Sequence, residues 1–113
     1  MCWPSGPPSP AVELQASYAA SFEREHGCTE AEWLGWLPGA VRDHRLELPA
    51  PGQARIGIGG GSLHLSWQAL PPRQLGLARF PRLQISYVFD ALDQAERLAF
   101  MRYFDLYMQR GGG

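Results

Sequence analysis

The C-terminal segment from Asp93 to Arg110 constrains the fold most, because it has helical periodicity and an unusually wide apolar surface. On a helical wheel four of its polar residues fall in one narrow arc that only Leu98 interrupts. These polar residues are Gln94, Arg102, Asp105 and Gln109. An amphipathic helix ordinarily has an apolar stripe of about 100°, and here the stripe is about twice as wide. One sheet face cannot cover such a surface, so we expect a second element, or a second subunit, to pack against its flank.

The ends of this helix can also be recognised in the sequence. Asp93 and Glu96 have the spacing of a capping box, in which each side chain accepts a hydrogen bond from a backbone N–H group of the first turn. Arg110 lies where the helix dipole favours a positive charge. Three glycines follow, at residues 111–113. They predict the end of the helix and a short glycine tail.

The N-terminal part of the chain combines a proline-rich segment with a helical pattern. Residues 1–10 contain four prolines, which predict a flexible tail because proline disrupts both helices and strand ladders. Leu14, Tyr18 and Phe22 then recur every four residues. This spacing predicts a first helix from Ala11 to His26.

A second, shorter helix is predicted directly afterwards. Thr29 and Glu32 have the spacing of another capping box, and Pro38, followed by glycine, should end or kink the helix within two turns. Trp33 and Trp36 lie three residues apart and share one face of this helix. Their bulk is typical of a plug at one end of a core, and two alternatives are a wall of a ligand pocket and an anchor for a partner.

The middle of the chain, from about His44 to Phe89, has apolar residues at every second position. Alternation of this kind predicts antiparallel strands with one buried and one polar face. The predicted buried positions are Leu46, Leu48, Ala54, Ile56, Ile58, Leu63, Leu65, Trp67, Leu75, Leu77, Leu83, Ile85, Tyr87 and Phe89. The predicted breaks between the strands are residues 49–52, 59–61 and 71–72 and Pro81, which are rich in proline and glycine.

Together these elements predict one α+β domain over residues 11–110, which suits a chain of 113 residues. We expect two N-terminal helices, a four- or five-stranded antiparallel meander, and the long C-terminal helix packed on one sheet face. The links between strands are short, which favours pairing between neighbours in the sequence.

The glycine-rich run at residues 57–62 resembles a phosphate-binding loop in composition only. A phosphate loop needs a helix N-terminus directly after the glycines, so that N–H groups point at the anion. Here a strand pattern follows, with His64 and Ser66 on one face. We therefore predict a hairpin turn at residues 59–61. Direct activation of Ser66 by His64 is not expected, because residues two apart on a strand are about 7 Å apart.

The composition excludes several kinds of catalytic and metal site. All ten basic residues are arginine, so a P-loop lysine and a Schiff-base lysine are impossible. His26 and Cys28 form one close pair of possible zinc ligands, but no second pair follows, so we predict no metal site. No cofactor motif is present, and the carboxylates near the last helix are explained as caps or, for Asp105, as part of a solvated face.

Arg73, Arg79 and Arg82 gather around the proline-containing breaks between the later strands. Arginine side chains at such positions can grip a carboxylate or phosphate, or can protect an edge strand from aggregation. The net charge of −1 and the absence of aromatic side chains from the predicted polar face argue against nucleic acid as a partner. No apolar run is long enough to span a membrane, and the N-terminus lacks a signal-peptide pattern, which favours a cytoplasmic location.

We therefore expect a protein-binding or adaptor module without catalytic activity, which forms a homodimer or binds a small partner protein through the last helix or the open sheet face. The alternative is a carrier or enzyme for a small molecule, with an apolar pocket between the sheet and the last helix. The residues expected to contact a ligand or partner are Trp33, Trp36, Trp67, His64, Arg73, Arg79, Arg82, Tyr103 and Tyr107.

Overall fold

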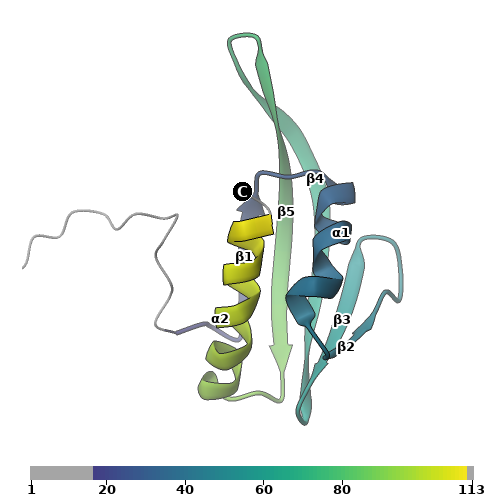
Figure 1. Ribbon diagram of the computed structural model, residues 1–113, viewed down its shortest axis with the longest axis vertical. Coiled ribbons are helices and arrows are strands. Elements are labelled where there is room, and N and C mark those ends of the chain that lie inside the picture. The colour runs from purple at the N-terminus through teal and green to yellow at the C-terminus, as the bar shows by residue number, and fades with distance from the viewer. Residues whose placement is uncertain (1–16, 112–113) are drawn as a thin grey trace, which may run out of the picture.

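A computed structural model describes residues 17–111 of the chain (Figure 1). Its elements in chain order are β1 (Ser21–His26), α1 (Glu30–Val41), β2 (Arg45–Glu47), β3 (Gln53–Ile58), β4 (Gly61–Leu75), β5 (Ala78–Asp90) and α2 (Gln94–Gly111). The fold is α+β, as predicted. The proline-rich tail predicted at residues 1–10, the first part of the predicted helix, at residues 11–16, and the end of the glycine tail lie outside the described residues.

The five strands form one antiparallel sheet in the order β1-β5-β4-β3-β2. Strands β2 to β5 are the predicted meander, in which each strand pairs with its neighbour in the sequence. Two glycines, Gly59 and Gly60, join β3 to β4, so the predicted hairpin turn is confirmed. Gly59 has a φ of +55°, a conformation that residues with a Cβ rarely adopt.

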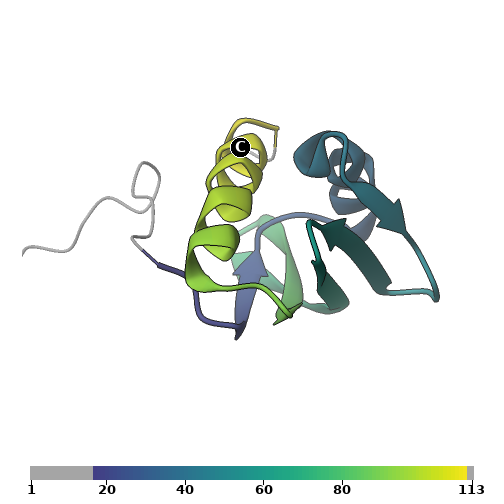
Figure 2. The same cartoon turned by 90° about the horizontal axis from the view of Figure 1, so that it is seen from below.

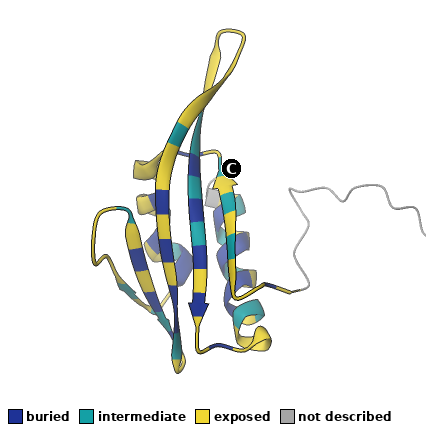
Figure 3. Cartoon of the chain, turned by 180° about the vertical axis from the view of Figure 1, so that it is seen from behind, coloured by how far each residue is buried: buried dark blue, intermediate teal, exposed yellow. Residues whose placement is uncertain are grey.

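Both helices lie on the same face of the sheet (Figure 2). The side chains that point from the sheet toward the helices follow the predicted alternation in β3, β4 and β5. The buried apolar strand residues are Ala54, Ile56, Ile58, Leu63, Leu65, Trp67, Leu83, Ile85, Tyr87 and Phe89. The prediction is wrong for Leu48, Leu75 and Leu77, which are exposed. Figure 3 shows the opposite face, where buried and exposed bands alternate along each central strand and no described helix covers the sheet.

The predicted capping boxes are both present. The Thr29 hydroxyl accepts from the backbone N–H of Glu32, and the Glu32 carboxylate accepts from the backbone N–H of Thr29. Asp93 and Glu96 make the same reciprocal pair at the start of α2. Pro38 does not end α1, which was one of the two predicted effects of this proline. The helix continues to Val41, and Arg42 then adopts a φ of 56°.

The predicted first helix is wrong where the structure describes it. Residues Ser21–His26 form strand β1, which pairs with β5 at the edge of the sheet, so one helix, not two, precedes the meander. The four-residue spacing of Tyr18 and Phe22 suggested a helix, but β5 offers β1 a full ladder of backbone hydrogen bonds. Tertiary pairing of this kind overrides local preference.

The predicted breaks at residues 71–72 and at Pro81 are also wrong. Strand β4 continues through both prolines to Leu75, and β5 already begins at Ala78. The turn lies at Gly76, which has a φ of +60°, and Leu77. The register shifts between Leu70 and Arg73, so a bulge accommodates the two prolines. As a result one long hairpin projects beyond the rest of the sheet (Figure 1).

The wide apolar surface of α2 is covered from two directions. Its buried residues Phe100, Met101, Phe104 and Met108 face the core. On one flank lies α1: the guanidinium of Arg42 stacks 4.1 Å from the centre of the Tyr103 ring, and the Tyr107 ring lies against Gly39. A Cβ atom at Gly39 would overlap the Tyr107 hydroxyl. The second element that the sequence required is therefore α1, from the same chain.

Candidate functional site

The tryptophans predicted to contact a ligand or partner belong mainly to the core. Trp33 is fully buried, Trp67 is buried, and Trp36 packs at the margin of the core. The Trp33 ring lies 5.8 Å from the Trp67 ring and 6.1 Å from the Phe104 ring, between centroids. The Trp67 indole N–H donates to the Glu30 carboxylate at 2.8 Å. These contacts anchor α1 on the sheet.

The space between the sheet and α2, where a ligand pocket was the alternative prediction, is filled by aromatic rings. The Tyr87 and Phe104 rings meet edge to face at 6.1 Å between centroids, and the Phe100 and Phe104 rings are 5.7 Å apart. Tyr103 and Tyr107 lie half-buried at the boundary between the two helices. Their rings close that boundary.

His64 is exposed on the face of the sheet that lacks helices. Its Nε2 atom lies 3.3 Å from the hydroxyl of Ser62, a residue that was not among the predicted site residues. Ser62 is buried, and in the described part of the chain no carboxylate orients His64. The pair therefore lacks the accessible nucleophile and the third group that nucleophilic catalysis requires.

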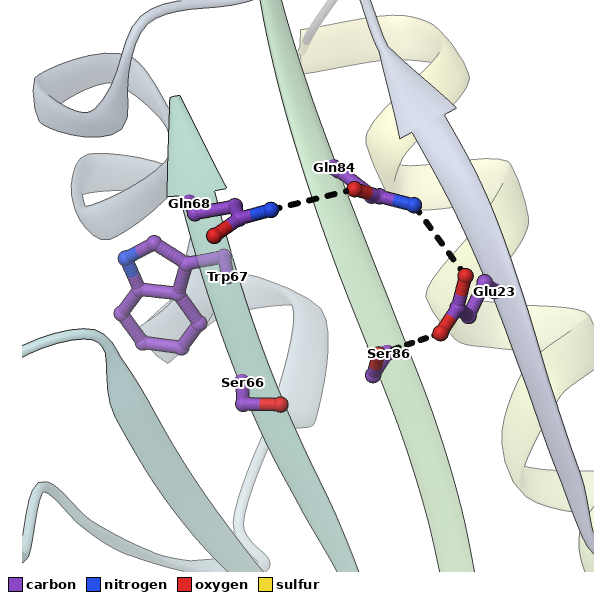
Figure 4. A pocket seen from close by; sticks show the side chains of 6 residues that line it. All are labelled: Glu23, Ser66, Trp67, Gln68, Gln84 and Ser86. Atoms are coloured by element: carbon purple, nitrogen blue, oxygen red, sulfur yellow. Dashed lines mark hydrogen bonds between the residues drawn. The ribbon is translucent and has the colours of Figure 1, made fainter. Parts of the chain in front are cut away.

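The same open face has a shallow depression of about 260 Å³ (Figure 4). Glu23, Ser66, Gln68, Gln84 and Ser86 line it together with Trp67. The Gln84 amide donates to Glu23 at 3.1 Å, the Ser86 hydroxyl donates to the same carboxylate at 3.3 Å, and the Gln68 amide donates to Gln84 at 3.3 Å. These hydrogen bonds link the polar groups across β1, β5 and β4.

A buried ion pair joins β1 to α2. Asp105 accepts two hydrogen bonds from the Arg24 guanidinium, at 2.7 and 3.1 Å, and one from the Tyr18 hydroxyl at 2.5 Å. Asp105 is only 8% exposed, so the prediction that it lies on a solvated face is wrong. The Arg24 guanidinium also lies over the rings of Tyr18, Phe22 and Tyr87. Burial and the Asp105 carboxylate raise the pKa of Tyr18 to about 12.

Two more titratable groups, His26 and Tyr87, lie close to this ion pair. The Nε2 atom of His26 lies 3.2 Å from the Tyr87 hydroxyl. Burial, together with the Arg24 charge, lowers the pKa of His26 below its ordinary value. Burial raises the pKa of Tyr87 and raises the pKa of the Cys28 thiol to about 11. All of these shifts favour neutral forms, and the groups lie inside the fold, which indicates a structural role.

The projecting end of the β4–β5 hairpin contains the three arginines singled out from the sequence. Every residue from 71 to 80 is exposed, including three large apolar side chains. These are Leu75, Leu77 and Phe80, with exposed fractions of 61%, 103% and 47%. We name residues 69–82 the hairpin tip. Its residues 71–80 are the longest continuous run of exposed residues in the described part of the chain.

At the base of the hairpin tip, Arg82 makes a bidentate pair with Glu25 of β1, with two N–O distances of 2.9 Å. The guanidinium of Arg73 lies 3.7 Å from the same carboxylate. Arg79 makes no ion pair within residues 17–111. The structure thus brings Arg73 and Arg82 together around one carboxylate and leaves Arg79 facing solvent.

No known protein family model matches the sequence, and a search of curated proteins found no match. Within residues 17–111, no group of three or more histidine, cysteine or acidic side chains is arranged to hold a metal ion. Neither described helix combines the length and apolar character needed to cross a membrane.

Proposed function

We propose that this protein is a protein-binding or adaptor module without catalytic activity, and that it contacts its partner through the hairpin tip. The observation that carries the proposal is the exposure of Leu75, Leu77 and Phe80 within one projecting segment. Single exposed apolar side chains are common on protein surfaces, but three on one short hairpin make an apolar patch that is concentrated in one projecting segment. Nothing in the described fold covers this patch.

The energy available from this patch is enough to support specific binding. Full burial of a leucine or phenylalanine side chain contributes about 1.5–3 kcal/mol. Three such side chains therefore provide several kcal/mol, and arginine, which is enriched at interface hot spots, adds directional contacts. The antiparallel ladder between β4 and β5 holds these side chains in place before binding, which lowers the entropy lost on association.

Site-specific photo-crosslinking in cells that express the full chain tests the proposal. A benzophenone amino acid replaces Leu77 at the hairpin tip in one variant and Leu34, an exposed leucine of α1, in a matched control. We expect a discrete crosslinked protein from position 77 and none from position 34. A second copy of the chain would add 12.6 kDa and would identify a homodimer. Equal crosslinking at both positions, or none at position 77, would refute the proposal.

A further inference from the structure

The hairpin tip is open on both of its edges. Strand β3 pairs with β4 only as far as Ser66, and β1 pairs with β5 only down to Leu83. Beyond those points β4 and β5 have only each other as partners among the described elements. An open edge of this kind can accept an additional strand from a partner.

Prolines make such strand addition unfavourable at this hairpin. Pro71 and Pro72 remove two backbone N–H donors from β4, and Pro81 removes one from β5. The register shift between Leu70 and Arg73 interrupts the ladder further. A partner strand would therefore meet gaps on a short edge, so the side chains are the groups that remain for recognition.

The pairing register divides these side chains between two faces. Arg73 lies opposite Phe80, and Leu75 lies opposite Ala78. Residues that are directly opposite, or two apart along a strand, share a face of a sheet. These four residues therefore form one face, which we name the mixed face.

Arg79 lies opposite Gln74 and belongs to the reverse face of the hairpin tip. Along β5, Leu83 and Ile85 point toward the helices, so Phe80 and Arg82 continue the face that lacks helices. The mixed face thus combines apolar and cationic groups and is continuous with the open face of the sheet.

The charge of the hairpin tip is opposite to that of the remaining chain. The tip contains three arginines and no acidic residue. The whole chain has ten arginines and eleven acidic residues, so the remainder has seven against eleven and a net charge of −4. A cationic patch on an otherwise anionic protein favours an anionic partner surface and suppresses self-association through like charges at the tip.

The contact with Glu25 shows the chemistry that these arginines accept. The Glu25 carboxylate is held by two parallel N–H···O bonds from Arg82, with Arg73 beside it. Arg82 is thereby fixed at the base of the hairpin, while most of the Arg73 side chain remains exposed. Arg73 lies next to Phe80 on the mixed face, so a partner carboxylate can bind Arg73 while a neighbouring apolar side chain packs on Phe80.

On these grounds we infer that the mixed face of the hairpin tip binds an acidic peptide segment of a partner protein, one that carries apolar side chains next to its carboxylates. The inference rests on the proposed function and specifies the partner. Binding uses Arg73, Leu75 and Phe80, through side chains and not through strand addition. Arg79, on the reverse face, takes no part.

Selection of peptides from a random 12-residue display library against the immobilised full chain tests this inference. We expect the selected peptides to be enriched in aspartate or glutamate beside leucine, phenylalanine or tryptophan. Arg73→Glu should weaken their binding by about tenfold or more, and Phe80→Ser by a similar factor. Arg79→Glu makes the same charge change on the reverse face and should leave affinity within about twofold of the wild type.

A charge-reversal measurement separates recognition from misfolding. Peptides in which lysine replaces the acidic residues should bind the Arg73→Glu variant better than they bind the wild type. Selected peptides that are basic or neutral, equal losses in the Arg73 and Arg79 variants, or tight binding of duplex DNA or phosphatidylserine vesicles through Arg73 would each overturn the inference. If no selected peptide contacts the hairpin and position 77 also fails to crosslink, both this inference and the proposed function are refuted.

Discussion

The Asp105→Asn substitution keeps the size of a buried side chain and removes its charge. The wild-type carboxylate accepts three hydrogen bonds, two from Arg24 and one from Tyr18. The amide oxygen of asparagine retains at most part of this set, and the amide nitrogen faces the Arg24 guanidinium. The substitution therefore removes the negative charge of Asp105 from beside a cation that is mostly buried.

The expected loss of stability follows from the burial of the two partners. Removing one member of a fully buried ion pair costs about 3–5 kcal/mol, and a hydrogen bond to a charged group contributes about 1.5–3 kcal/mol. The Arg24 side chain retains 23% of its exposure, so water compensates for part of the lost charge. We expect the free energy of unfolding to fall by about 2–3 kcal/mol, a large share of the roughly 5–15 kcal/mol of a typical domain.

Urea denaturation, followed by tryptophan fluorescence, measures this loss. A small domain loses about 1–3 kcal/mol of stability per molar urea, so the midpoint should fall by about 1–2 M without a change in slope. Asp93→Asn is the matched control, because Asp93 is exposed and asparagine caps a helix as well as aspartate does. The control should change stability by no more than about 0.5–1 kcal/mol.

An apolar replacement of both charges completes the test. In Arg24→Met with Asp105→Leu, neither charge remains, so we expect the double variant to be more stable than Asp105→Asn alone. The reasoning would be refuted if Asp105→Asn lost no more stability than Asp93→Asn. It would also be refuted if the double variant were the least stable of the set.

Three further predictions concern packing and ionisation. Gly39→Ala should destabilise the fold by about 1–3 kcal/mol, because the added Cβ would overlap Tyr107. The control is Gly35→Ala, where the added Cβ enters open space on the same helix, and it should stabilise the fold by about 0.5–1 kcal/mol. The same urea titration measures both. Burial lowers the pKa of His26 below 6.5 in the folded protein. Between that folded-state pKa and pH 6.5, the unfolded chain therefore binds more protons than the folded chain. Stability should therefore fall as the pH decreases from 6.5 toward the folded-state pKa, and a His26→Phe variant without that slope checks this assignment by denaturation at several pH values. Cys28, with a pKa of about 11, should react with iodoacetamide in a Cys2→Ser background far more slowly in the native state than in urea, and a native rate equal to the unfolded rate would contradict its burial.

The elements predicted correctly from the sequence are those with strong local signals. The alternation of Leu63, Leu65 and Trp67, and its counterparts in β3 and β5, requires a half-buried strand because a shift by one residue would place every apolar side chain in water. The capping boxes were also recognisable, because both partners lie within four residues. The width of the apolar surface on α2 indicated a second packing partner, although it did not identify α1.

The elements that were missed depend on contacts between distant parts of the chain. Strand β1 has its half-buried side chains at every second position, at Phe22, Arg24 and His26. Two of these three residues are polar, so the sequence of β1 does not show the alternation of apolar and polar residues that predicts a strand. Asp105 is buried only because the fold pairs it with Arg24, which lies 81 positions away in the sequence. A carboxylate on the polar arc of a helix has no local feature that distinguishes an internal ion pair from a solvated side chain.

The hairpin tip was missed for a related reason. Proline usually marks the end of a strand, so the prolines at residues 71–72 and Pro81 predict turns. Two strands without neighbours on their outer edges tolerate proline, because few of their outward N–H groups have a partner to lose. The three arginines near these prolines were identified as candidates, but only the register of β4 and β5 separates Arg73 from Arg79.

The position of β1 at the far edge of the sheet has a consequence for protein synthesis. The strands β3, β4 and β5 can pair with one another as soon as each leaves the ribosome, because their contacts are between neighbours in the sequence. His26 must wait for Tyr87, 61 positions later, and Arg24 must wait for Asp105, 81 positions later. A nascent chain halted before α2 would expose an unfinished sheet, so synthesis of the eighteen residues of α2 commits the molecule to its native state.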